Sequence, residues 1–189
     1  KEIELGCFPF DSKGKKIILY QGAINIGRGL ELMIDTMEFL DDSIFVIVGH
    51  GDIFDNLIGR VKNKKLGSKI YFLGKIAPEK LHKLTPLANL GVSFEEDLGL
   101  NYRFALPNKI FDYIQAEVPI LVSNLPEMKQ IALEHHVGEV IKNRNPAFLA
   151  KQIEALMEKD FSNELKKAKQ ELIWENQEEK LLNIFRNCE

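Results

Sequence analysis

Residues 16–29 read KIILYQGAINIGRG, and this stretch decides the fold. Its first part, Lys16 to Gln21, is a continuous apolar run, which is typical of a parallel strand covered on both faces. A loop with glycines at positions 22, 27 and 29 follows, and a helical pattern begins where this loop ends. A buried strand that leads through a glycine-rich loop into a helix predicts an α/β protein.

The rest of the chain repeats this alternation of strands and helices. Further strands are predicted at residues 43–48, 69–73, 90–94, 118–122 and 138–141. Parallel neighbours need crossover connections, so the pattern predicts a doubly wound parallel sheet of the Rossmann-like type. The segment 95–106 is expected to be a long irregular loop, and Pro107 is expected to be the first residue of the next helix.

The pattern divides the chain into three parts. Residues 1–15 are expected to be a linker from a missing N-terminal domain, residues 16–160 a Rossmann-like domain, and residues 161–189 a set of C-terminal helices. The chain begins with Lys1 instead of methionine, and its first residues have an extended character. These features indicate a piece of a longer protein.

Composition excludes several classes of protein. Of the 189 residues 45% are hydrophobic and 28% are charged, which is the balance of a globular domain. The net charge of -3 gives no reason to expect a nucleic-acid partner. No apolar run approaches the roughly 20 residues of a membrane span, and no signal peptide is recognised. Cys7 and Cys188 lack the spacing of a zinc site or a disulfide scaffold, so a reducing, cytoplasmic location is expected.

The loop after the first strand has features of an anion site. In an open parallel sheet, ligands bind outside the carboxyl ends of the strands. Glycines allow a ligand to approach the backbone, and the free N–H groups of the next helix favour an anion. Arg28 adds a cation suited to phosphate oxygens. The alternative is that the glycines only form the turn and that Arg28 is solvated. The loop does not match the Gly-x-Gly-x-x-Gly dinucleotide fingerprint.

The helix predicted to begin at Pro107 carries a second set of polar residues. Asn108 and Lys109 lie in its first turn, and Asp112 follows one turn later. A lysine at this position opposes the helix dipole at a cost of roughly 0.3–1 kcal/mol, which a bound anion would remove. Asp112 is suited to accept hydrogen bonds from two adjacent hydroxyls, as a ribose presents them. The alternative is a solvated carboxylate favoured by the dipole.

Four segments, in this order along the chain, resemble one known family. It is the large retaining family of GT-B glycosyltransferases that includes sucrose and glycogen synthases and many bacterial cell-surface transferases, and the resemblance is to its C-terminal domain. The segments that carry it are the first glycine-rich loop (20–30), the Val-Gly-His-Gly turn (48–51), the Ile-Tyr-Phe-Leu-Gly-Lys segment (70–75) and the Pro-Asn-Lys-Ile-Phe-Asp-Tyr helix (107–113).

The resemblance implies a role for each matching position. Asp112 matches the glutamate that binds the ribose, and Lys75 and Ile76 match the segment that contacts the base through its main chain. The donor diphosphate would meet Gly22, Arg28 and Lys109. The donor sugar would face Leu98, Gly99, Leu100, Asn101 and Asn108. The resemblance implies no metal and no cofactor beyond the nucleoside diphosphate sugar itself.

The sequence departs from the family pattern at two places. Family members carry a second phosphate-binding arginine where this chain has Ala23, and they often carry a glutamate where it has Phe104. Glu95, Glu96 and Asp97 are nearby candidates for the missing acid, but a solvated acidic loop is an equal alternative.

The resemblance therefore implies the donor-binding domain of a retaining glycosyltransferase, which transfers a sugar from a nucleoside diphosphate sugar to an acceptor such as a polysaccharide or glycolipid precursor. This domain is expected to be inactive on its own, with the acceptor held by the missing domain. Peripheral membrane association through that missing domain is also expected. The alternatives are a degenerate GT-B scaffold and a sugar-nucleotide epimerase of the same architecture. The C-terminal helices carry Trp174, Leu181, Leu182 and Phe185, which would contact the missing half or pack on the present domain.

Overall fold

The structure is a computed structural model that describes residues 8–12 and 14–186. Within helix α9 it describes no side chain at position 177 or at positions 179–181. Cys7, Cys188 and part of the predicted linker (1–15) therefore lie outside the described residues, and the side chain of Leu181 does so as well.

Within the described residues, six strands form one sheet in the order β3-β2-β1-β4-β5-β6, and every pair of neighbours is parallel. The chain builds one half of the sheet outward from β1 and then returns to place β4 on the other side of β1. This is the doubly wound, Rossmann-like order, which confirms the predicted fold class. The strands are β1 (Lys16–Gln21), β2 (Ser43–Val48), β3 (Ile70–Gly74), β4 (Leu90–Ser93), β5 (Ile120–Val122) and β6 (Gly138–Val140).

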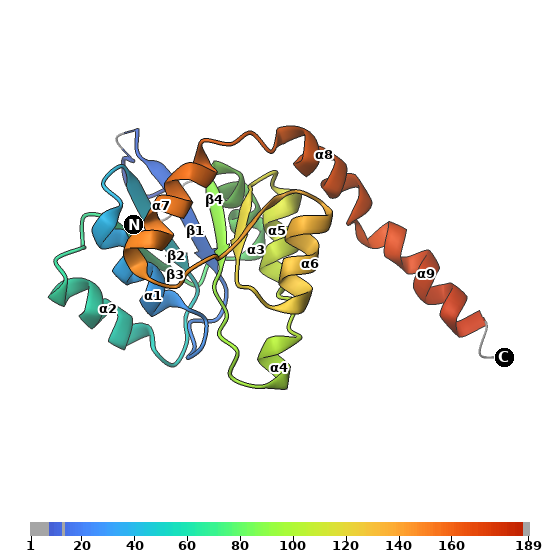
Figure 1. The fold of residues 1–189 in the computed structure, drawn as a ribbon, viewed down its shortest axis with the longest axis horizontal. Coiled ribbons are helices and arrows are strands. Elements are labelled where there is room, and N and C mark those ends of the chain that lie inside the picture. The colour runs from blue at the N-terminus through green and yellow to red at the C-terminus, as the bar shows by residue number, and fades with distance from the viewer. Residues whose placement is uncertain (1–7, 13, 187–189) are drawn as a thin grey trace.

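Helices cover both faces of this sheet (Figure 1). On one face α1, α2 and α7 bury Met33, Leu57 and Ile153 against the strands. On the other face α5, α6 and α8 bury Ile114 and Met128 in a second cluster. The helices are α1 (Leu30–Thr36), α2 (Phe54–Asn63), α3 (Pro78–Leu84), α4 (Leu100–Arg103), α5 (Asn108–Gln115), α6 (Pro126–Glu134), α7 (Pro146–Met157), α8 (Ser162–Glu171) and α9 (Trp174–Arg186), with short 3₁₀ turns at Met37–Phe39 and Thr85–Leu87.

Two details of the segment between β4 and α5 differ from the sequence-based expectation. The loop contains a short helix, α4, which stands apart from the sheet at the carboxyl ends of the strands (Figure 1). Pro107 is the N-cap of α5 and not its first helical residue, since its backbone is extended with ψ at 136°. Its carbonyl nevertheless accepts the first helical hydrogen bond, from the Ile110 amide, so Asn108 and Lys109 do occupy the first turn.

The two C-terminal helices differ in their contacts. Helix α8 packs against α5 and buries Leu165 and Ala168, and the side chain of Gln115 donates to the carbonyl of Lys169 at 3.0 Å. Helix α9 extends away from the body (Figure 1), and its Trp174 and Phe185 are exposed. No helix in the described part of the chain is both long and apolar enough to cross a membrane.

Candidate functional site

The sheet opens where β1 and β4 lie side by side. Their pairing covers Ile18 with Leu90 and Leu19 with Gly91, although β1 continues to Gln21 and β4 to Ser93. The connections from these two strands lead to opposite halves of the sheet. In doubly wound sheets this reversal creates a crevice at the carboxyl ends of the strands, and ligands bind there.

Tyr113 fills the space between the two diverging strands. Its buried hydroxyl accepts a hydrogen bond from the Gln21 amide and donates one to the Leu19 carbonyl, both at 3.1 Å. Its ring lies against Gly91, where any larger residue would overlap the ring atoms. An isolated glycine inside a strand often marks such a close approach, so Gly91 is the signal in the sequence for this contact. The tyrosine therefore anchors α5 to the strands that border the crevice.

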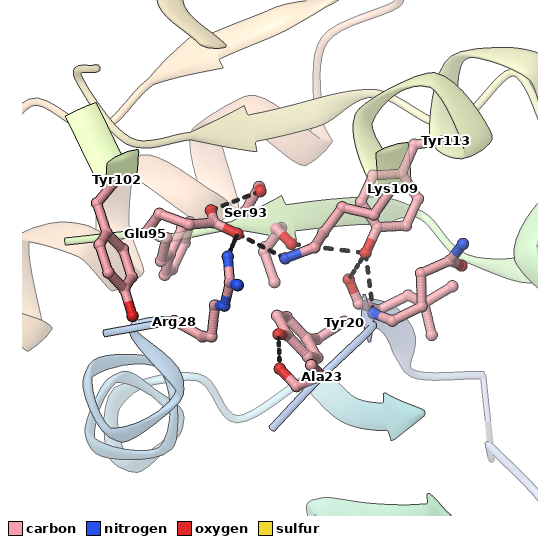
Figure 2. Close-up of polar contacts among 12 residues, drawn as sticks. Tyr20, Ala23, Arg28, Ser93, Glu95, Tyr102, Lys109 and Tyr113 are labelled. Atoms are coloured by element: carbon pink, nitrogen blue, oxygen red, sulfur yellow. Dashed lines mark hydrogen bonds and ion pairs between the residues drawn. The ribbon is translucent and has the colours of Figure 1, made fainter. Parts of the chain in front are cut away.

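Arg28 and Lys109, the two predicted phosphate-binding cations, meet at one carboxylate (Figure 2). Lys109 Nζ donates to Glu95 Oε1 at 2.7 Å, and Arg28 Nη1 lies 3.6 Å from the same oxygen. Two helix starts that are far apart in the sequence thus contribute their cations to one pocket. The convergence of Arg28 and Lys109 is the central geometric feature of the site.

Glu95 is a fully buried acid in the loop after β4. Its side chain is 0% exposed, and its second oxygen accepts a hydrogen bond from Ser93 Oγ at 2.6 Å. The expectation of a solvated acidic loop is therefore wrong for this residue. Lys109 also differs from the expectation, because its charge at the start of α5 is compensated within the chain by Glu95 before any ligand binds.

Burial and the Glu95 carboxylate act in opposite directions on the pKa of Lys109. Its side chain is 8% exposed, and this burial lowers the pKa of Lys109 from its ordinary value. The nearby Arg28 guanidinium lowers that pKa further, whereas the Glu95 carboxylate raises it. The ammonium group also lies 4.3 Å from the centre of the Tyr20 ring, where the face of the aromatic ring attracts a cation. Glu95 and Tyr20 together stabilise the charged form.

Arg28 is less completely satisfied than Lys109. Its guanidinium carbon lies 5.7 Å from the centre of the Tyr102 ring, which α4 places beside it. Within the described part of the chain, Arg28 Nε is buried and has no hydrogen-bond partner. An unpaired buried donor costs free energy, and a ligand oxygen reached by a small rotation of the guanidinium would remove this cost.

A cavity of about 510 Å³ lies in front of these cations, and we call it the switch-point cavity. Asp112 lies on its wall, and its Oδ2 accepts a hydrogen bond from Gln21 Nε2 at 2.8 Å. Gln21 is itself held by Thr85, whose hydroxyl donates to Gln21 Oε1 at 3.0 Å. The cavity is lined by Tyr20, Gln21, Gly22, Ala23, Arg28, Leu81, Ala105, Leu106, Pro107, Asn108, Lys109 and Asp112.

The structure brings together some of the predicted site residues and separates others. Gly22, Arg28, Asn108, Lys109 and Asp112 all line the switch-point cavity. The other predicted residues do not line it: Lys75 and Ile76 follow β3, Leu98 borders a neighbouring cavity, and Gly99, Leu100 and Asn101 form the exposed start of α4.

The neighbouring cavity, of about 460 Å³, lies at the carboxyl ends of β4 and β5, and we call it the acidic-loop cavity. Glu95 borders this cavity but not the switch-point cavity. It is lined by Glu95, Glu96, Asp97, Leu98, Ser123, Asn124, Leu125, Ile141 and Arg144. The carboxylate therefore lies behind the two cations as seen from the switch-point cavity.

Several solved structures share this fold. TarM from S. aureus, in complex with Fondaparinux, alpha-GlcNAc-glycerol and UDP, is 19% identical with a TM-score of 0.73, over 99% of this chain and 37% of that chain. Sucrose-phosphate synthase from Thermosynechococcus elongatus is 18% identical with a TM-score of 0.77, over 95% of this chain and 46% of that chain. Anabaena HepE in complex with UDP is 12% identical with a TM-score of 0.78, over 93% and 50%.

At these identities the likeness shows the fold, and the chain spans half or less of the length of these three proteins. A comparison with curated protein sequences finds no significant match. The family model for glycosyl transferases group 1 matches residues 9–172, which include both cations, Glu95 and Asp112. The chain therefore belongs to the family of glycosyl transferases group 1.

Proposed function

We propose that the switch-point cavity binds the nucleoside diphosphate part of an activated sugar, and that the protein transfers this sugar to an acceptor with retention of configuration. The observation that carries the proposal is the convergence of Arg28 and Lys109 on one wall of a cavity that also holds Asp112. Its volume of about 510 Å³ is in the range of small-molecule sites. The complexes of TarM and HepE with UDP support the assignment.

The cations suit the chemistry of the leaving group. When the bond between sugar and diphosphate breaks, negative charge grows on the diphosphate oxygens. Arg28 and Lys109 are held in place before the reaction, so they stabilise this charge without reorganising at the moment of bond cleavage. The unpaired Nε–H of Arg28 supplies a further donor for a phosphate oxygen.

The remaining parts of the donor are assigned along the cavity. Asp112 would accept from the ribose hydroxyls, since Gln21 fixes its Oδ2. The base would lie toward α3, because Leu81 of this helix lines the cavity and the loop with Lys75 and Ile76 leads directly into α3. The segment 98–101 and Asn108 would face the sugar. This chain covers only part of each of its structural neighbours, and we place the acceptor site in the region of the protein that corresponds to their uncovered part.

We expect Arg28→Ala to weaken the binding of both UDP and inorganic pyrophosphate by roughly 10- to 100-fold. The reason is that a hydrogen bond to a charged group contributes about 1.5–3 kcal/mol. Isothermal titration calorimetry with each compound measures the effect. Arg103→Ala is the matched control, because Arg103 is exposed on α4, pairs with Asp97 and does not line the cavity. Unchanged affinity in the Arg28 variant would contradict the proposal.

Asp112→Ala is expected to separate the ribose from the diphosphate. It should weaken UDP binding by about tenfold, the lower end of the range for a charge-assisted hydrogen bond, because Asp112 is partly exposed. Pyrophosphate has no ribose, so its affinity should stay within about twofold of the parent value. Asp112→Glu, which keeps the carboxylate, should retain most of the UDP affinity. An equal loss for both compounds would remove Asp112 from the ribose site.

A further inference from the structure

The backbone is held in place on both sides of Glu95. The backbone before it is closely packed, because Gly29 leaves no room for a side chain against the Phe94 carbonyl, and Arg144 Nη2 donates to that carbonyl at 3.1 Å. The backbone after it is tied to the first loop, since the Glu96 amide donates to the Gly27 carbonyl at 2.9 Å. The carboxylate is therefore fixed on both sides along the chain.

Glu95 and the two cations border different cavities. Arg28 and Lys109 face the switch-point cavity, whereas Glu95 borders the acidic-loop cavity behind them. One of its oxygens contacts both cations, and the other accepts from Ser93. The Ser93 hydrogen bond and the backbone contacts on both sides hold this carboxylate beside the two cations.

We infer that Glu95 is the positioning residue of the diphosphate site: its buried carboxylate holds Arg28 and Lys109 side by side and charged, so that both can bind one diphosphate. The inference rests on the proposed function. Glu95 itself touches no ligand, and its role is to position Arg28 and Lys109, which bind the diphosphate.

The charged groups around Lys109 come from each element packed against it. Glu95 approaches from the loop after β4, Arg28 from the loop after β1, and Tyr20 from β1 itself. Asp112 lies one turn along α5 on the same helix. Of these, Arg28 opposes the charge on Lys109, and the Glu95 carboxylate at 2.7 Å is its nearest opposite charge. Removing that carboxylate charge would lower the pKa of Lys109 beyond the lowering already caused by burial.

The test is the pH profile of UDP binding by Glu95→Gln, measured by calorimetry from about pH 7 to about pH 10. This range lies between the pKa of the second phosphate ionisation and the pKa of free lysine. UDP affinity requires charged Lys109, so it falls as the pH rises through the pKa of Lys109, and this fall should occur at lower pH in the variant. Between the two midpoints, where Lys109 is neutral in the variant but still charged in the parent, we expect about 10- to 100-fold weaker binding than in the parent. The deficit should shrink as the pH is lowered, because Lys109 regains its proton.

Two further variants separate charge from shape. Glu95→Asp keeps the negative charge on a shorter side chain, so it should keep the pH profile of the parent even where its affinity is lower. Glu96→Gln removes the neighbouring charge, which lies 3.8 Å from Arg144 and does not contact Lys109, and it should leave the profile unchanged. The melting temperature of each variant, from circular dichroism, confirms that it is folded at the temperature of the titration.

A second measurement needs no ligand. The titration of the Lys109 side chain, followed by NMR in the parent and in Glu95→Gln, should show a lower midpoint in the variant, and an unchanged midpoint would refute the inference.

Tighter UDP binding by Glu95→Gln at every pH would show that the carboxylate competes with the ligand, and parallel pH profiles would show a purely structural role. Either result overturns the inference while the proposed function stands. A parent chain that binds neither UDP nor pyrophosphate overturns both.

Discussion

Lys109→Met is expected to lower the free energy of unfolding by about 3 kcal/mol, because breaking a buried ion pair costs about 3–5 kcal/mol and leaves one charge unpaired. The unpaired charge would be Glu95, whose side chain is fully buried. We expect the lower end of the range, since Arg28 remains 3.6 Å from the same carboxylate oxygen. Urea denaturation of the parent and the variant measures the loss. Methionine preserves the apolar stem of the side chain, so packing changes little.

The double variant Glu95→Gln/Lys109→Met tests the cause of this loss. It removes both charges, so most of the lost stability should return, because the destabilised species is the unpaired carboxylate. UDP binding should not return, because one of the two phosphate-binding cations is still missing. A single variant as stable as the parent, or a double variant no more stable than the single one, would show that the pair is not coupled in the way the contact at 2.7 Å indicates.

Tyr113→Ala is expected to have a comparable effect on stability, of about 3–5 kcal/mol, the range for removing a large buried aromatic side chain. The ring is completely buried between α5 and Gly91 of β4. Its loss leaves a cavity between the two diverging strands and removes the contacts that anchor α5 to β1 and β4. Since Lys109 and Asp112 lie on that helix, UDP affinity should fall together with stability. Denaturation and calorimetry on the same samples measure both quantities.

Tyr113→Phe separates the ring from the hydroxyl. It keeps the ring against Gly91 but leaves the Gln21 amide and the Leu19 carbonyl without their partner, so about 1–3 kcal/mol should be lost. The two variants therefore divide the effect between packing and hydrogen bonding. Equal losses in both would show that the hydroxyl alone carries the contribution of Tyr113.

The elements of the fold could be predicted from sequence because their signals are local. The strands Lys16–Gln21 and Ser43–Val48 have the bounds that the apolar pattern indicates. Asn145 is the N-cap of α7, and its side chain accepts from two amides of the first turn, which is the usual role of asparagine at this position. These signals depend on residues within a few positions of one another. The short helix α4 was missed because four residues carry too little periodicity.

The site could be predicted in part. The helix starts that carry Arg28 and Lys109 were identified from their loops, and the strand order brought them to one cavity. The resemblance supplied the assignment of Asp112, which lies in the same cavity. Lys75 and Ile76 do not line the cavity. The binding roles of all these residues remain predictions.

The sequence by itself determined the alternation of strands and helices, the parallel sheet and the two helix starts with their cations. Only the tertiary structure decided that Glu95 is buried behind Arg28 and Lys109, while Glu96 next to it is partly exposed. Apolar periodicity is a property of residues close together in the sequence, but the energy of a charge depends on its distance from other charges and from water. Those distances are set by which strands pair and where the chain reverses across the sheet, and no short stretch of sequence contains them.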